Sequence, residues 1–174
     1  MSSSDNLIAQ NILGQIPASR GILWEKIENF KNKISVIEGA LTHNPGDEQS
    51  EGLKKTAPLK HHFEGGLYTR EIFMPKGAVI VSLIHKQEHP SFLLKGELSY
   101  LTDDGEIVRV KAPHTVFTKK GTQRVFYIHE DVEWSCVHKT DATNVLDAEL
   151  ELFTNNYREL PSDVINIKKE IWQQ

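Results

Sequence analysis

The sequence predicts a mainly β protein, with an antiparallel sandwich or barrel at its centre and helices at both ends. Short β-rich runs separated by Gly, Pro and Asp follow one another at close intervals between residues 77 and 138. Residues 67–74, just before them, alternate with the two-residue period of a strand, and apolar residues recur at helical spacing towards both termini. Many short strands with such turn signals form an antiparallel sandwich or barrel.

The expected strands account for most of the central region. Asp104 and Gly105 stand between two of the runs and predict a two-residue hairpin turn, because these residue types tolerate positive φ angles. The runs themselves span residues 78–84, 92–94, 97–101, 107–110, 115–117, 124–128 and 132–138. With the alternating segment, they place the barrel at residues 61–142.

Residues 1–42 predict a helical arm. A short amphipathic helix should end at Pro17, and a stronger one should begin near Ser19. Its apolar residues recur at steps of four and three: Leu23, Ile27, Phe30, Ile34, Ile37 and Leu41. Such a seam packs against another surface, so the helix either folds back over the barrel or assembles copies of the chain into a helix bundle.

The remaining segments are a linker and a helical C-terminus. Residues 43–60 are rich in Pro, Gly and charge and poor in apolar side chains, which is typical of a linker. Residues 143–174 predict two C-terminal helices separated by Pro161. The first is expected from apolar residues at steps of four, three and four: Leu146, Leu150, Phe153 and Tyr157.

Composition excludes several classes of protein. The chain has 174 residues, a net charge of −4 and one cysteine, Cys136. No clustered basic surface indicates nucleic-acid binding, no apolar run is long enough for a membrane span, and no internal disulfide can form. We therefore expect a soluble, cytoplasmic protein with no nucleic-acid or membrane partner.

Part of the central region resembles the cupin superfamily of small jelly-roll barrels. Gly96 matches the glycine that closes the first cupin segment, His85 stands in the second histidine slot of that segment, and His89 stands in its glutamate slot. Leu83 replaces the first histidine, and Arg124 stands three residues after Gly121, where the second segment has its histidine. The resemblance, over residues 61 to 140, implies a cupin-like jelly-roll barrel, and it is stronger to a group of small cupin-like proteins associated with bacteriophage and prophage genomes.

The histidines of this segment suggest a metal site. His85 and His89 could supply two ligands to one divalent transition metal (Fe, Mn, Ni or Zn), with Gln87 on the same strand face. A third donor is needed. His138 is the strongest candidate, because Trp134, Cys136 and His138 alternate onto one strand face; the others are His114, His129, Glu71 and Glu97.

Arg124 indicates a different ligand. A guanidinium stays charged and repels a metal ion, but it offers a forked contact to a carboxylate or phosphate. We therefore expect Arg124, with Trp134 and Gln87, to bind a small ligand.

Two functions remain open from the sequence. One is a non-catalytic ligand-binding or structural module, whose N-terminal helix would assemble a homo-oligomer or join a larger assembly such as a phage particle. The other is a metal-dependent cupin enzyme of the dioxygenase or isomerase type that acts on a small anionic substrate. Jelly rolls serve both roles, so the fold does not choose between them.

Overall fold

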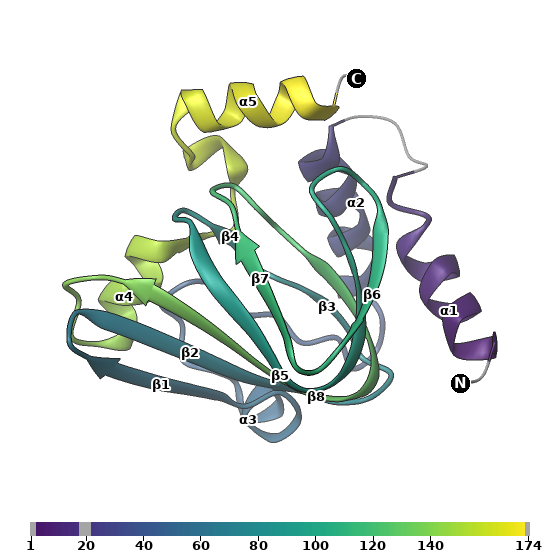
Figure 1. The fold of residues 1–174 in the computed structure, drawn as a ribbon, viewed down its shortest axis with the longest axis horizontal. Helices are drawn as coiled ribbons and strands as arrows, with labels where there is room; N and C mark the ends of the chain where they lie inside the picture. The colour runs from purple at the N-terminus through teal and green to yellow at the C-terminus, as the bar shows by residue number, and fades with distance from the viewer. Residues whose placement is uncertain (1–2, 18–21, 173–174) are drawn as a thin grey trace.

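A computed structural model describes residues 3–17 and 22–172 of the chain, and it shows a curved antiparallel sheet with helices around it (Figure 1). The strands are β1 (Leu59–Glu64), β2 (Leu67–Met74), β3 (Val79–Val81), β4 (Ile84–His85), β5 (His89–Leu101), β6 (Ile107–Lys111), β7 (His114–Thr118), β8 (Val125–Lys139) and β9 (Phe153–Thr154). The helices are α1 (Ser3–Leu13), α2 (Leu23–Ser35), α3 (Glu51–Thr56), α4 (Val145–Leu152) and α5 (Ser162–Trp172), with a 3-10 turn, η1 (Tyr157–Glu159).

The sheet topology confirms the predicted mainly β, antiparallel core with helices at both ends. Seven strands of the described chain form one sheet in the order β1-β2-β8-β5-β6, with β3 paired to β8 and β7 paired to β5. The hydrogen-bonded path through these described strands does not return on itself, so the sheet curves without closing into a barrel. The strands β4 and β9 form a separate two-stranded sheet.

The two longest strands, β5 and β8, each contain two of the runs that were predicted as separate strands. Residues 92–94 and 97–101 both lie in β5, and residues 124–128 and 132–138 lie almost entirely in β8. The pairing of β5 with β8 shifts register around Gly96, which has a φ of +85°. A Cβ atom there would lie 2.1 Å from the Asp131 carbonyl oxygen, so glycine permits this bulge and the strand bends where a turn was expected.

The predicted hairpin forms between β5 and β6, but its turn is longer than expected. Leu101 pairs with Ile107, and the Thr102 N–H donates to the Glu106 carbonyl, which leaves three residues at the tip. Of these, only Gly105 has a positive φ, at +82°. This geometry suits a three-residue turn that needs a single left-handed residue.

The N-terminal helices pack against the sheet. Leu23 and Ile27 of α2 lie with Leu13 of α1 in one buried cluster, which also contains Leu101 and Val125 of the sheet. Helix α2 ends at Ser35, so the last two residues of the seam, Ile37 and Leu41, follow it and are exposed. The first half of the seam therefore covers the protein's own sheet, and self-association through this arm stays a prediction; Ser19, its expected start, lies outside the described residues.

The expected linker contains regular structure. Within residues 43–60, Ser50 caps α3 by accepting a hydrogen bond from the Leu53 N–H, and β1 begins at Leu59. The side chain of Gln49 bonds the backbone at both Ala57 and Leu59, at 3.0 and 2.9 Å. Side-chain hydrogen bonds therefore order a segment whose composition indicated a linker.

The first C-terminal helix is shorter than predicted and buries another face. Helix α4 ends at Leu152, and Phe153 continues as strand β9. Leu146 and Leu150 are each 52% exposed, whereas the carboxylate residue Glu149 is 1% exposed. The spacing of the apolar residues gave a wrong prediction of the buried face, because the hydrogen bonds and ion pair of the buried Glu149 hold this helix against the rest of the protein. The second helix, α5, matches its prediction.

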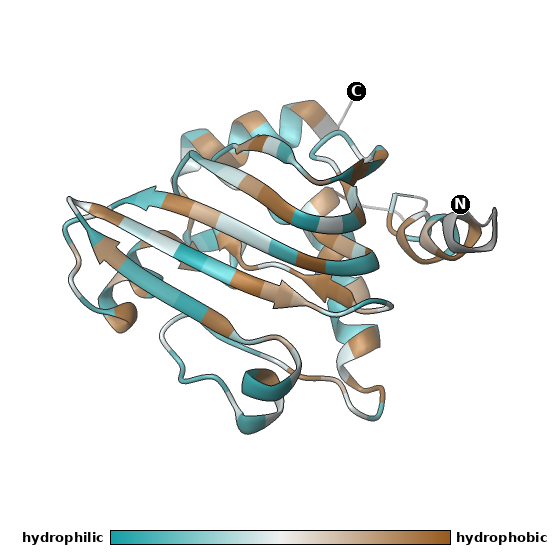
Figure 2. Ribbon diagram, turned by 60° about the horizontal axis from the view of Figure 1, so that its bottom comes forward, coloured by the Kyte–Doolittle hydropathy of each residue, from teal (hydrophilic) through white to brown (hydrophobic). Residues whose placement is uncertain are grey.

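The interior of the curved sheet is apolar. Along its strands, hydrophobic and hydrophilic residues alternate (Figure 2). One cluster of buried hydrophobic residues consists of Met74, Leu93, Leu98, Tyr100, Phe126, Ile128, Val132 and Trp134. No helix in residues 3–17 or 22–172 combines the length and apolar composition needed to cross a bilayer.

Candidate metal centre and adjoining cavity

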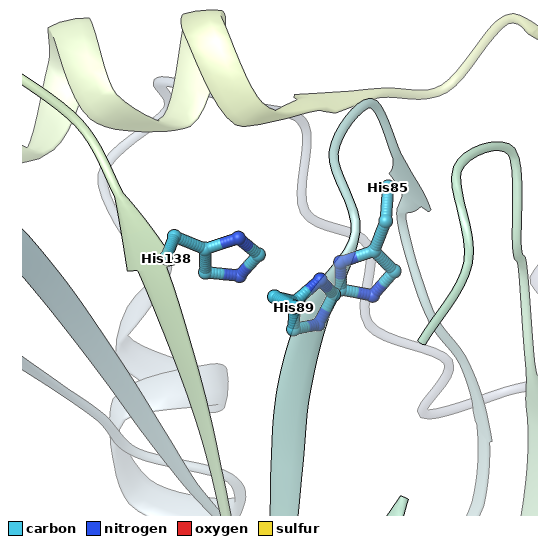
Figure 3. A group of neighbouring side chains, drawn as sticks. All are labelled: His85, His89 and His138. Atoms are coloured by element: carbon cyan, nitrogen blue, oxygen red, sulfur yellow. The ribbon is translucent and has the colours of Figure 1, made fainter. Parts of the chain in front are cut away.

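Three histidines from three strands converge at one end of the sheet. His85 ends β4, His89 begins β5 and His138 lies near the end of β8, and their rings turn towards one another (Figure 3). The ring centroids of His89 and His138 are 3.9 Å apart, and those of His85 lie 4.4 Å from His89 and 5.8 Å from His138. One nitrogen of each residue lies within 4.8 Å of those of the other two. The sequence prediction placed these same three residues together.

Strand register brings His89 and His138 face to face. Ser91 pairs with Cys136 in the antiparallel ladder of β5 and β8, and two residues further along the same register His89 stands opposite His138. The short polar turn after His85 then returns the chain to β5. Backbone bonds fix His85 itself: its N–H donates to the Thr122 carbonyl at 3.1 Å, and its carbonyl accepts from the Gly121 N–H at 2.8 Å.

The nitrogens that face this cluster have no protein partner. His85 Nδ1, His89 Nε2 and both ring nitrogens of His138 are buried without a hydrogen bond among the described residues. Buried polar atoms are nearly always paired, and each orphan costs about 1–3 kcal/mol. A cluster of such atoms from three separate strands is the pattern that a bound ion would satisfy.

The tautomer of His89 suits metal binding. Its Nδ1 lies 3.1 Å from the Gln87 carbonyl oxygen, which can only accept a hydrogen bond, so Nδ1 carries the proton. The lone pair is therefore on Nε2, the buried orphan atom. A backbone carbonyl that holds the other ring nitrogen is the usual support of a metal-ligating histidine.

All three rings are neutral at physiological pH. Burial is the main cause that lowers the pKa of His89 to about 4 and of His138 to about 3. Burial also holds the pKa of His85 well below its ordinary value, and the neighbouring His89 and His138 rings add to this effect. Neutral imidazole is the form that binds a metal, so the cluster is ready without loss of a proton.

Phe153 contacts both the histidine cluster and the side chain of Arg70. Its ring stands edge-on to His85 and His138, with centroids 5.2 Å away in both cases. The guanidinium carbon of Arg70 lies 5.3 Å from the same ring, and Arg70 Nε donates to Glu149 at 3.2 Å. The charge of Arg70 is thus balanced by a carboxylate.

A cavity of about 890 Å³ adjoins the cluster, and His85 forms part of its wall. The inner face of the sheet supplies apolar side chains, among them Ile72, Ile80 and Phe126. Segments after α2 and around α3 cover the other side. The volume falls within the range of about 300–1,000 Å³ that is usual for small-molecule sites.

Arg124 and Trp134, two of the three residues expected to bind a ligand, line this cavity. Cys136, on the same face of β8 as Trp134, also lines it, and the Trp134 Nε1–H points to Cys136 Sγ at 3.3 Å. The third residue, Gln87, does not lie in the cavity. Its side chain donates to Glu151 at 3.2 Å on the surface, because the turn between β4 and β5 breaks the strand parity expected for this stretch.

The other candidates for a third donor lie elsewhere. Glu97 pairs with Arg109 at 2.8 Å, and His129 Nε2 lies 2.7 Å from the Ser99 hydroxyl. His114 and Glu71 are not part of the cluster either. Three residues that shape the site were missed by sequence reasoning: Phe153, Arg70 and Glu149. For Arg70 the sequence did contain a signal: the alternation of residues 67–74 places it on the same strand face as Ile72 and Met74.

No protein-family model and no curated protein matches the sequence. Cupin-domain proteins are among the solved structures to which part of the chain is similar. The Cupin_2 domain of an XRE family transcriptional regulator from Enterobacter cloacae is 17% identical, with a TM-score of 0.41 over 47% of this chain and 94% of that one. An RmlC-like cupin family protein with a double-stranded β-helix fold from Methanocaldococcus jannaschii is 16% identical, with a TM-score of 0.42 over 49% and 82%.

A third similar structure is the EutQ protein of Clostridium difficile, at 18% identity and a TM-score of 0.41 over 49% of this chain and 70% of that one. Each of these similarities covers about half of the present chain. No activity and no ligand follows from them.

Proposed function

We propose that this protein is a small-molecule-binding module built around one divalent transition-metal ion, held by His85, His89 and His138. The observation that carries the proposal is the group of buried, unpartnered ring nitrogens that converge from three strands. Imidazole nitrogens bind Zn, Fe, Ni and Cu well, and a site of three histidines is a known arrangement for zinc.

The surroundings of the cluster support an ion with open coordination positions. Three protein ligands leave room for water or a small molecule. His85 lies both in the cluster and in the cavity wall, so such a position would be reached from the cavity. A ligand in the cavity would therefore reach the ion where His85 forms the cavity wall.

A metal-dependent enzyme is the second candidate function. A bound ion would supply Lewis-acid chemistry to a substrate in the cavity. The protein's own contribution would be to bind and orient that substrate through Arg124 and Trp134, and to exclude water with the apolar wall. Open coordination positions on such an ion would favour this candidate. Against it, the buried carboxylate of Glu149 is bound to Arg70 and is not free to act as a general base.

Elemental analysis of untagged protein tests the proposal. We expect close to one equivalent of a transition metal, after reconstitution if necessary, and its loss in a variant with His85→Ala and His89→Ala. His114→Ala is the matched control, because His114 lies in a strand of the same sheet but outside the cluster. A wild-type protein that binds no transition metal, or a double variant that retains it, would refute the proposed centre.

A further inference from the structure

Arg124 is a buried cation that lines the cavity. It exposes only 7% of its surface, and burial is the main cause that lowers its pKa. Among the described residues, one of its five N–H groups has an acceptor, since Nη1 donates to Thr118 Oγ1 at 2.8 Å, and the guanidinium carbon lies 5.4 Å from the centre of the Tyr100 ring. The other donors are left for a ligand.

No carboxylate in the described part of the chain lies within ion-pair distance of Arg124. The ion pairs there involve other basic residues, and Asp103, the acidic group with the largest favourable effect on Arg124, is 2.6 Å from Lys168 Nζ. The contrast with Arg70, which also lines the cavity but is bound to Glu149, is direct. Buried charges in proteins are usually paired, so an anion in the cavity would give Arg124 the ion pair that the described residues do not provide.

The rest of the cavity selects for an apolar molecule. On the sheet side, the cavity wall includes apolar side chains such as Ile72, Ile80, Phe126 and Trp134. An inorganic anion would satisfy the guanidinium and leave this apolar surface wet. A molecule with an acidic head and an apolar body would satisfy both.

We propose that the cavity binds a monocarboxylic acid with an apolar body, with its carboxylate on the Arg124 guanidinium and its body along the sheet interior. A carboxylate matches the planar fork of a guanidinium with two parallel hydrogen bonds. The proposal names the ligand class of the module proposed above, and it rests on the cavity and on Arg124, not on the metal.

Calorimetric titration of the full chain, in the presence of a chelator, tests this ligand class. The probes are octanoate, 1-octanol and acetate. We expect octanoate to bind about tenfold to a hundredfold more tightly than octanol, which is the usual worth of a hydrogen-bonded charge. Across a series of acids, affinity should rise about fourfold for each added methylene until the cavity is filled.

Variants locate the site. Arg124→Gln should lower octanoate affinity to that of octanol, whereas Arg158→Gln, at an exposed arginine outside the cavity, should change nothing. Should Arg124→Gln fail to fold, Ala78→Leu serves instead, because the larger side chain narrows the cavity and should weaken the binding of both octanoate and octanol. The comparison of acid and alcohol needs no variant.

Three results would overturn the proposal: no binding of octanoate, equal binding of octanoate and octanol, or octanoate binding that Arg124→Gln leaves unchanged. Octanoate that binds only after Zn²⁺ is added, and independently of Arg124, would place the carboxylate on the metal; it would refute this site and leave the metal centre standing. Arg124-dependent binding of octanoate to a protein that holds no metal under any condition would support this site and refute the metal centre.

Discussion

Acid should destabilise the metal-free protein well before its carboxylates titrate. His89 and His138 have pKa values of about 4 and about 3 when folded, against 6.5 for an unperturbed histidine. Between pH 6.5 and 4 the unfolded chain therefore binds more protons than the folded chain does. The free energy of unfolding is highest above pH 6.5 and falls as the pH is lowered through this range. At pH 5 the loss is about 2 kcal/mol for each of these two residues.

The effect should be large because His85 shifts in the same direction. Together, the cluster should remove at least about 4 kcal/mol between pH 7 and pH 5, out of the 5–15 kcal/mol that is usual for a folded domain. Urea denaturation at pH 7, 6 and 5, with a chelator present and circular dichroism as the probe, measures this loss.

A variant tests its origin. His89→Gln should reduce the loss between pH 7 and pH 5 by about 2 kcal/mol, whereas His62→Gln, at an exposed histidine of β1, should leave it unchanged. A free energy of unfolding that is the same at pH 7 and pH 5 would show that the three rings are not held neutral, and the reasoning would fail.

Two further predictions concern the frame that holds the site. Gly96→Ala should destabilise the protein by at least about 1–3 kcal/mol, because the residue has a positive φ and the new Cβ would meet the Asp131 carbonyl; a melting temperature like that of the wild type would contradict this. Glu149→Gln should cost about 3–5 kcal/mol, because it removes the charge of a buried carboxylate and leaves the half-buried Arg70 without its ion-pair partner. In denaturant titrations Glu48→Gln, at an exposed glutamate, is the control, and equal stability of the two variants would contradict the role of Glu149.

Local patterns in the sequence predicted most strand segments and the three members of the histidine cluster. The two-residue period of β2 and the turn signal at Gly105 are set by neighbouring residues, so both could be predicted. The grouping of His85 and His89 was predicted from the cupin resemblance and from strand parity, although a turn and not an extended strand brings the two residues together. His138 was added because residues 134, 136 and 138 alternate onto one face of a strand. Whether that group binds metal stays a prediction.

Features that depend on distant contacts could not be predicted. Gly96 indicates a turn by itself, and only the Asp131 backbone opposite it makes the position a bulge within one long strand. The apolar period of residues 146–157 predicted a longer helix, because the burial of Glu149 depends on Arg70, His43 and the Gly46 N–H, which come from other parts of the chain. Gln87 was assigned to the site for a similar reason: an extended chain was assumed where a turn occurs.

The central claim is that three imidazoles hold one metal ion, and X-ray absorption spectroscopy of the zinc-loaded protein tests it most directly. The account predicts three histidine nitrogens at about 2.0–2.1 Å from the zinc and no sulfur ligand. A sulfur at about 2.3 Å, which Cys136 alone among the side chains could supply as a thiolate, would contradict the assigned ligand set. A spectrum of hydrated zinc with no histidine scattering would contradict the site itself.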